Sequence, residues 1–237
     1  MLQAPPKNRF FVTGTDTDAG KTLVTVAFLT LCKRLGHSVA GMKPIAAGAT
    51  LELGRWVNED ALQLLEAGSS RVPYEVINPF CFAPPIAPHI AARLEGIPLT
   101  AQLIAERCTP FLNSAFDYGF IEGAGGWRVP LNETETYADV VAKLKLPVIL
   151  VVGLKLGCLN HALLTMEAIE HDGLQLAGWV GNQVHSVPMS RMEENLDSLR
   201  ERLSAPCLGI VPFIPAGNLG QEAAGYISLP KVTELPA

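Results

Sequence analysis

The 237-residue sequence predicts a single α/β domain, residues 1–237, built on a mostly parallel, doubly wound sheet. Three observations lead to this prediction. Short β-rich runs alternate with longer helical patterns, which is typical of βαβ crossovers. The run PVILVV at 147–152 is continuously apolar, as expected for a parallel strand buried on both faces. Hydrophobic residues make up 49% of the chain and charged residues 17%, so the chain can bury a large core.

The first part of the chain contains three of the predicted strands. Residues 10–13 (FFVT) and 118–121 (YGFI) are rich in aromatic side chains, and residues 39–42 (VAGM) form a short apolar run. Helical patterns between these strands predict helices at 21–35, 59–66, 90–94 and 99–111. The segment 72–89, which is rich in proline, fits neither pattern and is interpreted as an elaboration of the same domain.

Beyond residue 121 the alternation is regular. Apolar runs predict strands at 148–152, 176–180 and 208–211, and the patterns between them predict helices at 137–144, 162–171 and 190–203. Several of the predicted helices in the chain stop just before a glycine, which is a common C-terminal signal. Residues 183–189 are interpreted as a surface loop. The chain has neither an internal repeat nor a flexible interdomain linker, so one domain is expected.

Charge and hydropathy argue against several classes of function. The formal net charge is -5, and no run of Lys and Arg could neutralise successive phosphates, so a nucleic-acid partner is not expected. The longest apolar run, 146–154, is well short of the roughly 20 residues that span a bilayer. Residues 1–9 contain two prolines and no apolar stretch typical of a secretory signal. We therefore expect a cytoplasmic protein without a membrane partner.

The five cysteines show no pattern typical of a disulfide framework or a zinc site. Their number is odd, their spacing is wide and no Cys-x-x-Cys pair occurs. The expectation is that Cys32, Cys81, Cys108, Cys158 and Cys207 are small apolar residues of the interior.

A Gly-rich loop joins the first predicted strand to the first predicted helix. Residues 9–22 read RFFVTGTDTDAGKT, a variant of the phosphate-binding pattern G-x-x-x-x-G-K-[ST] in which the first glycine is Gly14 and not residue 15. Backbone N–H groups of such a loop attract phosphate oxygens. Lys21 could then reach the β- and γ-phosphates, and Thr22 could offer its hydroxyl to Mg²⁺. The sequence therefore predicts a P-loop NTPase-like fold that binds ATP and Mg²⁺, although a plain strand-to-helix turn would use the same residues.

Two charged residues follow predicted strands, at the edge where open α/β sheets bind ligands. Glu122 comes directly after the strand 118–121 and precedes the Gly-rich run 123–126, so it is a candidate second ligand for Mg²⁺. Lys43 follows the strand 39–42 and could stabilise negative charge on a transferred phosphoryl group. Taken alone, each residue also fits an ordinary turn.

These segments together resemble the dethiobiotin synthetase family over nearly the whole chain. The resemblance is carried by VTGTDTDAGKT (12–22), GMKPIAAG (41–48), Asn58-Glu59-Asp60, NPFCFAPPIAPHIAA (78–92), EGAGGWRVPL (122–131), LPVILVVGLKLGCLNHALLT (146–165) and AGWVGNQ (177–183). GTDTDAGKT and KLGCLNH are the most specific, because a generic P-loop protein has no reason to contain both.

The resemblance implies an ATP- and Mg²⁺-dependent cyclo-ligase with 7,8-diaminopelargonic acid and CO₂ as substrates. An amine and CO₂ would form a carbamate, ATP would convert it to a carbamic-phosphoric anhydride, and the second amine would close the ureido ring of dethiobiotin with release of ADP and phosphate.

The resemblance also implies roles for individual residues. Lys21 and Lys43 would act in catalysis beside the carbamate and the γ-phosphate. Thr22, Asp60 and Glu122 would hold Mg²⁺, and the role of Asp60 comes from the resemblance alone. Nucleotide contacts are implied for Asp18, Ala19, Gly20, Lys21, Thr22, Leu23, Asp60, Glu122, Gly123, Ala124, Gly125, Asn182, Gln183 and Pro212, with Asn182 at the adenine. Substrate contacts are implied for Thr17, Lys43, Ala47, Gly157, Cys158 and Leu159.

A homodimer is implied as well. The loop 156–160 would bind the substrate carboxylate of the partner subunit through backbone N–H groups, which requires no arginine. A strand-to-helix connection capped by Asn160 is compatible with the same residues.

Three positions depart from the family pattern. Ala47 stands where a serine usually offers a hydroxyl to the substrate, so that contact is either dispensable or replaced by backbone or water. Asp18 replaces a common glutamate, and Gln183 stands where an acid is common. We expect the last two to change contacts more than activity.

Three other interpretations stay open at this point. A ligase related to cobyrinic acid diamide synthetases would need a glutaminase domain, for which the chain is too short. A ParA- or MinD-like nucleotide switch typically has a second lysine at or next to position 15, where this chain has Thr15 and Asp16. An inactive homologue is disfavoured by the presence of all the charged residues named above.

Overall fold

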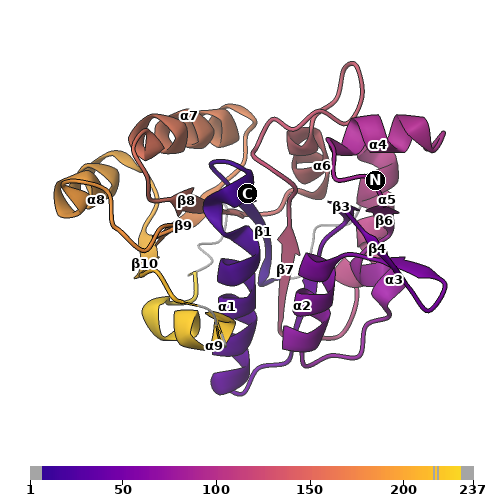
Figure 1. The fold of residues 1–237 in the computed structure, drawn as a ribbon, viewed down its shortest axis with the longest axis horizontal. Helices are drawn as coiled ribbons and strands as arrows, with labels where there is room; N and C mark the ends of the chain where they lie inside the picture. The colour runs from indigo at the N-terminus through magenta and orange to yellow at the C-terminus, as the bar shows by residue number, and fades with distance from the viewer. Residues whose placement is uncertain (1–6, 216, 218, 231–237) are drawn as a thin grey trace.

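The computed structural model describes residues 7–215, 217 and 219–230, and its central feature is a six-stranded parallel sheet (Figure 1). The strand order is β10-β9-β8-β1-β7-β2. The strands are β1 (Arg9–Gly14), β2 (Val39–Met42), β7 (Tyr118–Glu122), β8 (Val148–Gly153), β9 (Leu176–Asn182) and β10 (Cys207–Val211). All neighbouring pairs are parallel. The predicted fold class, a doubly wound α/β sheet of the P-loop type, is confirmed.

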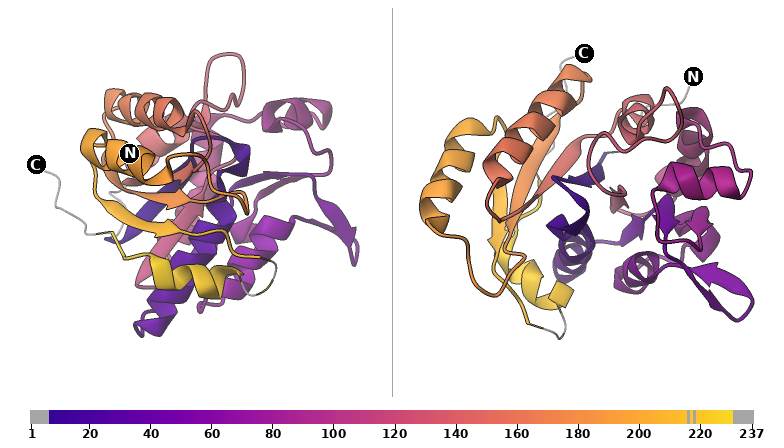
Figure 2. Two further views of the ribbon diagram at one scale, coloured as in Figure 1. Left: turned by 60° about the vertical axis from the view of Figure 1, so that its left-hand side comes forward. Right: turned by 45° about the horizontal axis from the view of Figure 1, so that its top comes forward.

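Helices cover both faces of this sheet (Figure 2). One face carries α1 (Lys21–Arg34), α2 (Glu59–Ala67) and α9 (Leu219–Ala223), and the other carries α5 (Ala101–Leu112), α6 (Tyr137–Leu144), α7 (Cys158–His171) and α8 (Met192–Arg202). Both faces of the strands are therefore buried, which explains why the strands are apolar at consecutive positions.

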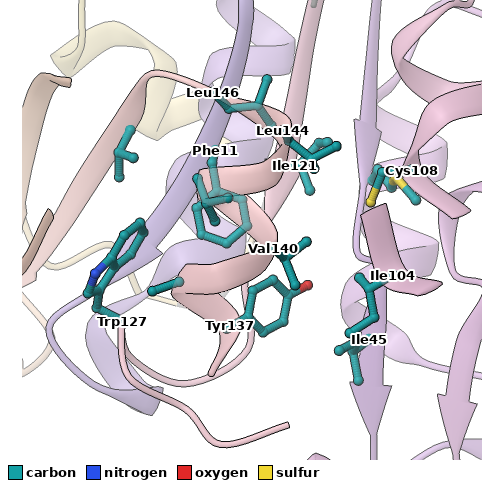
Figure 3. Packing of buried hydrophobic residues seen from close by; sticks show 14 of the residues in the cluster. Phe11, Ile45, Ile104, Cys108, Ile121, Trp127, Tyr137, Val140, Leu144 and Leu146 are labelled. Atoms are coloured by element: carbon teal, nitrogen blue, oxygen red, sulfur yellow. The ribbon is translucent and has the colours of Figure 1, made fainter. Parts of the chain in front are cut away.

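Successive side chains of β1 enter different hydrophobic clusters. Phe10 and Val12 pack with α1 on one face, and the Phe10 ring stacks on Phe120 of β7 at 5.7 Å between centroids. Phe11 points to the other face, where its ring lies 6.1 Å from Trp127 and 5.4 Å from Tyr137 (Figure 3). Because each fully buried side chain of this size contributes about 1.5–3 kcal/mol, both clusters fix the position of β1. The loop that follows β1 is thus attached to a rigid strand.

The region between β2 and α5 contains elements that the sequence did not predict. Two three-residue strands, β3 (Ile45–Ala47) and β6 (Phe80–Phe82), form a separate parallel pair. The strands β4 (Thr50–Glu52) and β5 (Arg55–Val57) form an antiparallel hairpin that projects from the body of the molecule (Figures 1 and 2). The proline-rich segment 72–89 contains α3 (Tyr74–Ile77), β6 and the first turn of α4 (Pro88–Leu94).

Several helix ends differ from the prediction for identifiable reasons. The helix α7 begins at Cys158, four residues before the predicted start, because Gly157 adopts the left-handed conformation with φ 96° and caps it. The alternative in which Asn160 caps this helix does not hold, since Asn160 lies in its first turn. Thr100 caps α5, whose first residue is Ala101 and not residue 99.

Other expectations concern loops, termini and thiols. The loop 183–189 is confirmed, and residues 185–188 are exposed. All five cysteines are free thiols, and Cys32, Cys108 and Cys158 are buried. Within the described residues, no helix has both the length and the apolar character needed to cross a membrane. The expectations for the chain ends fall partly on residues 1–6 and 231–237, which lie outside the described structure.

Candidate active site

The loop between β1 and α1 is held by its own backbone and side chains. Asp16 accepts a hydrogen bond from the N–H group of Asp18 at 3.0 Å and begins a short 3₁₀ helix, η1 (Thr17–Ala19). Gly20 follows with φ 89°, and a Cβ atom at this position would lie 2.1 Å from Nδ2 of Asn182. Only glycine fits here without strain. The chain can then enter α1 at Lys21, with the helix N-terminus directed at the loop.

The side chain of Lys21 turns back into the loop that precedes it in the chain. Its side-chain ammonium donates hydrogen bonds to the carbonyl oxygens of Asp16 at 2.9 Å and Thr17 at 3.2 Å, and the residue is only 4% exposed. Burial lowers the pKa of Lys21 to about 8, and the nearby carboxylate of Glu122 opposes this shift. The lysine is therefore mostly charged at neutral pH. Its charge is poorly neutralised, which suits the binding of an anion.

A second lysine is paired with two carboxylates beside the loop. The ammonium of Lys43, at the end of β2, donates to Glu122 Oε1 at 2.8 Å and forms an ion pair with Asp60 of α2. Burial disfavours the charged form of Lys43, but Glu122 and Asp60 outweigh it and raise its pKa above the ordinary value. Lys43 is therefore charged at neutral pH.

Glu122 is the centre of this cluster. It is completely buried at the end of β7, and its Oε1 atom also accepts a hydrogen bond from the Thr22 hydroxyl at 2.8 Å. Its other oxygen, Oε2, is buried and makes no hydrogen bond. A buried carboxylate oxygen without a partner is energetically costly, and this oxygen therefore fits the role of a ligand to a cation.

The donor set fits a small divalent cation. Thr22, Asp60 and Glu122 supply a hydroxyl and two carboxylates, and such hard oxygen ligands suit Mg²⁺. Among the described residues no group of three or more His, Cys, Asp or Glu side chains could hold a metal by itself. The remaining ligands of an ion at this place would therefore be water and oxygens of a bound phosphate.

A pocket of about 860 Å³ brings these groups together. Its polar lining comes from the loop, the strand ends and α2, and includes Thr17, Asp18, Gly20, Lys21, Thr22, Lys43, Asn58, Asp60 and Glu122. Its other lining residues, mostly apolar, are Ile45, Ala46, Ala47, Pro85, Ile86, Ala87, Pro88, Ala124, Gly125, Val129 and Pro130. A lining that combines charged groups with apolar residues suits a phosphorylated molecule next to an aliphatic one.

Other predicted nucleotide contacts lie on the far side of the loop. Asn182, at the end of β9, donates from Nδ2 to the carbonyl oxygen of Ala19 at 3.0 Å. The backbone N–H of Gln183 donates to Val211 at 2.9 Å, which places Gln183 beside Pro212. The predicted residues Ala19, Leu23, Gly123, Asn182, Gln183 and Pro212 do not line the pocket itself.

The predicted carboxylate-binding residues Gly157, Cys158 and Leu159 also lie outside the pocket of their own chain. They form the start of α7, next to Leu156, which is 94% exposed. The preceding Lys155 forms an ion pair with Asp16 of the phosphate-binding loop at 2.8 Å. The beginning of α7 is thereby connected to that loop.

Sequence reasoning missed several lining residues. Asn58 precedes α2 and caps it, a role that an Asn before two acidic residues and an apolar pattern does indicate. The wall formed by residues 85–88 and 129–130 has no comparable signal, because its residues are neutral and irregular in structure.

Comparisons with known proteins agree on one family. A family model described as an AAA domain matches residues 8–218. The chain is 51% identical to the ATP-dependent dethiobiotin synthetase BioD of Marinobacter nauticus over 208 residues, or 88% of this chain and 89% of that one. It is 52% identical to the enzyme of the same name from Cellvibrio japonicus, covering 92% and 95% of the two chains. It is also 52% identical to the ATP-dependent dethiobiotin synthetase BioD of Pseudomonas aeruginosa, covering 91% of this chain and 94% of that one.

Solved structures show the same fold at low identity. The septum site-determining protein MinD of Pyrococcus horikoshii, complexed with Mg-ADP, has a TM-score of 0.55 and 15% identity, covering 92% of this chain and 86% of that one. A chain of the MinC:MinD cell division protein complex of Aquifex aeolicus has a TM-score of 0.52 and 17% identity, over 91% and 86%. At such identities the likeness concerns the fold alone.

Proposed function

This chain belongs to the ATP-dependent dethiobiotin synthetase family and is a ligase of biotin synthesis, and from that premise we propose how its pocket performs the reaction. The substrates are 7,8-diaminopelargonic acid, CO₂ and ATP. The observation that carries the proposal is the position of Lys43, which lies in the same pocket as the phosphate-binding loop and is held by Glu122 and Asp60.

The proposed reaction has three steps. An amine of the diamine adds to CO₂, which forms an N–C bond and a carbamate and releases a proton. A carbamate oxygen then attacks the γ-phosphorus of ATP, the bond to the bridging oxygen breaks, and ADP leaves. The second amine attacks the carbonyl carbon of the carbamic-phosphoric anhydride, the C–O bond to phosphate breaks, and the ureido ring closes with loss of a second proton.

Lys21 and Lys43 are the proposed catalytic residues of the middle step. Negative charge moves among oxygens of the transferred group in phosphoryl transfer, and cations fixed beside it lower the barrier. Lys21 follows the loop that would bind the phosphates, and Lys43 lines the same pocket directly after β2. Both lysines therefore line the pocket in which the reacting oxygens would lie.

The nucleotide would bind along the loop and the end of β9. We assign its contacts to residues 18–23, to Asp60, Glu122 and the Gly-rich turn 123–125, and to Asn182, Gln183 and Pro212. The position of Asn182 supports this, because its Nδ2 donates a hydrogen bond to the carbonyl oxygen of Ala19, within the loop that would bind the phosphates.

Mg²⁺ would be held by Thr22, Asp60 and Glu122. When bound, it supplies positive charge to the phosphate oxygens. Support comes from the buried Glu122 Oε2, which has no partner in the described structure.

The diamine would bind to Thr17, Lys43 and Ala47, with its carboxylate at Gly157, Cys158 and Leu159 of the partner subunit in a homodimer. No arginine is present in the described lining of the pocket, so the carboxylate needs another partner. The N-terminus of α7 offers backbone N–H groups and a partial positive charge. Ala47 offers no hydroxyl to the substrate, and its carbonyl oxygen already accepts a hydrogen bond from Asn58 at 3.3 Å.

The proposal is tested by measuring phosphate release from Mg-ATP and bicarbonate with and without diaminopelargonic acid, with detection of dethiobiotin by mass. We expect phosphate release that requires the diamine and equals the dethiobiotin formed. A Lys21→Met variant is the control for contaminating ATPases. Diamine-independent hydrolysis without dethiobiotin would contradict the proposal and would favour a nucleotide switch of the ParA or MinD kind.

A further inference from the structure

Tyr74 lies outside the pocket, but its hydroxyl connects two segments that carry pocket residues. It is the first residue of α3 and is 5% exposed. Its oxygen accepts a hydrogen bond from the backbone N–H of Asn58 at 2.8 Å and donates one to Oδ1 of Asn78 at 3.0 Å. A single hydroxyl therefore uses both its donor and an acceptor position on different parts of the chain.

On one side the connection leads to Asp60. Asn58 caps α2, since its Oδ1 accepts from the N–H of Ala61 at 3.3 Å, and its Nδ2 donates to the carbonyl of Ala47. Asp60 lies in the first turn of the helix that starts here. The hydrogen bond from Asn58 to Tyr74 thus fixes the end of α2 that carries this carboxylate.

On the other side the connection leads to Lys43. Asn78 donates from Nδ2 to the carbonyl oxygen of Lys43 at 2.6 Å, and the N–H of Lys43 donates to the carbonyl of Ile77 at 2.9 Å. The backbone of Lys43 is therefore bound through both its polar groups to the end of α3. Figure 1 shows α2 and α3 next to each other, and both helices contact β2.

The chain of contacts closes on itself, because the Lys43 ammonium is paired with Asp60. Asn58 and Asn78 are only 7% and 4% exposed, so water cannot easily replace a lost hydrogen bond from either residue to Tyr74. On the basis of the function proposed above, we propose that Tyr74 is a positioning residue for phosphoryl transfer, which through Asn58 and Asn78 fixes the Lys43 ammonium relative to the Asp60 carboxylate.

The hydroxyl keeps its proton under all assay conditions. Burial raises the pKa of Tyr74 to about 12, although the hydrogen bond from Asn58 acts in the opposite direction. The donor role toward Asn78 is therefore constant near neutral pH. The ring has a separate contact, with the Arg55 guanidinium 4.6 Å from its centroid, and phenylalanine would retain it.

The test uses Tyr74→Phe in the full-length enzyme, with Asn78→Ser in parallel and Tyr137→Phe as the matched control. Tyr137 (Figure 3) is also a buried tyrosine, and its hydroxyl makes no hydrogen bond to any of the described residues. Its substitution removes the same atom without breaking a network. The readouts are kcat, the apparent KM for ATP, the Mg²⁺ concentration at half-maximal rate, and the thermal midpoint.

We expect Tyr74→Phe and Asn78→Ser to lower kcat about tenfold or more and to raise the half-saturating Mg²⁺ concentration, with the KM for ATP changed less than about threefold. Tyr137→Phe should stay within about twofold of wild type in kcat, in the KM for ATP and in the half-saturating Mg²⁺ concentration. Equal kcat values in Tyr74→Phe and the control, or a lower thermal midpoint without any kinetic change, would overturn the positioning role. Failure of the wild-type enzyme to form dethiobiotin would instead overturn the proposed function.

Discussion

At the scale of single residues, the two lysines of the pocket differ in how their charge is compensated. Lys43 is paired with two carboxylates, whereas Lys21 contacts only carbonyl oxygens within its hydrogen-bonding range. Their pKa values accordingly shift in opposite directions, upward for Lys43 and downward to about 8 for Lys21. Only Lys21 is therefore expected to lose its proton in mildly alkaline solution.

This difference predicts how ATP binding depends on pH. Above about pH 8 Lys21 of the free protein is mostly neutral, so it must take up a proton before it can bind ATP as a cation. The Kd for ATP should therefore be flat below that pH and rise by up to about tenfold per pH unit above it. Titration calorimetry at pH 7, 8 and 9 checks this. Lys21→Met should bind more weakly at every pH and without the rise; a wild-type Kd constant across the range would contradict the assignment.

The buried carboxylate of Glu122 leads to a prediction about the metal. Glu122→Gln keeps the shape of the side chain and an acceptor for Thr22 but removes the charge beside Oε2. We expect the Mg²⁺ concentration at half-maximal rate to rise about tenfold or more. Glu75→Gln is the matched control, because Glu75 is an exposed carboxylate paired with Arg55 at 2.6 Å. Equal Mg²⁺ dependence of the two variants would exclude Glu122 as a ligand.

At the scale of elements, the loop between β1 and α1 depends on its last glycine. Gly20 has φ 89°, and a methyl group there would collide with Asn182. Gly20→Ala should cost about 1–2 kcal/mol of stability for the backbone conformation alone and should also weaken ATP binding. Gly36→Ala separates the two effects, because Gly36 has φ 83° but open space around it. That variant should show a similar loss of stability in thermal unfolding with an unchanged Kd for ATP, and equal Kd values in both variants would contradict the role of Gly20.

The elements of the central sheet could be predicted from sequence because burial on both faces requires a continuous apolar run. For all six strands of that sheet, the predicted ends lie within two residues of the observed ends. The short strands between β2 and α5 could not be predicted, since β3 and β6 have three residues each and depend on pairing with segments distant in the chain. A run so short has no recognisable period.

The same distinction holds for the site. Lys21 and Thr22 follow from a local motif, and Glu122 and Lys43 from their position at strand ends. Asp60 lies on a helix, and no residue next to it in the sequence indicates a metal site. Its role as a metal ligand was therefore implied only by the family resemblance. The connection through Tyr74 depends on three segments meeting in space, and no spacing in the sequence indicates it.

At the scale of the whole molecule, one sheet organises both the core and the site. The two hydrophobic clusters pack against opposite faces of the same strands, and we therefore propose that the chain folds as a single domain. The charged residues of the pocket lie at the carboxyl ends of β1, β2 and β7 or at the start of α1 and α2. Parallel strands make this convergence possible because all their ends meet at one edge.

The separate strand pair β3–β6 has a consequence for how this enzyme could change over evolutionary time. Part of the apolar wall of the pocket, Ile45 to Ala47 and Pro85 to Pro88, lies on or next to that pair, while the phosphate-binding loop follows β1 of the large sheet. Substitutions of the apolar side chains with which the small unit lines the pocket would alter the shape offered to an aliphatic substrate, whereas the phosphate-binding loop is attached to the other sheet. The architecture thus allows new substrates to be acquired while the chemistry of ATP is inherited unchanged.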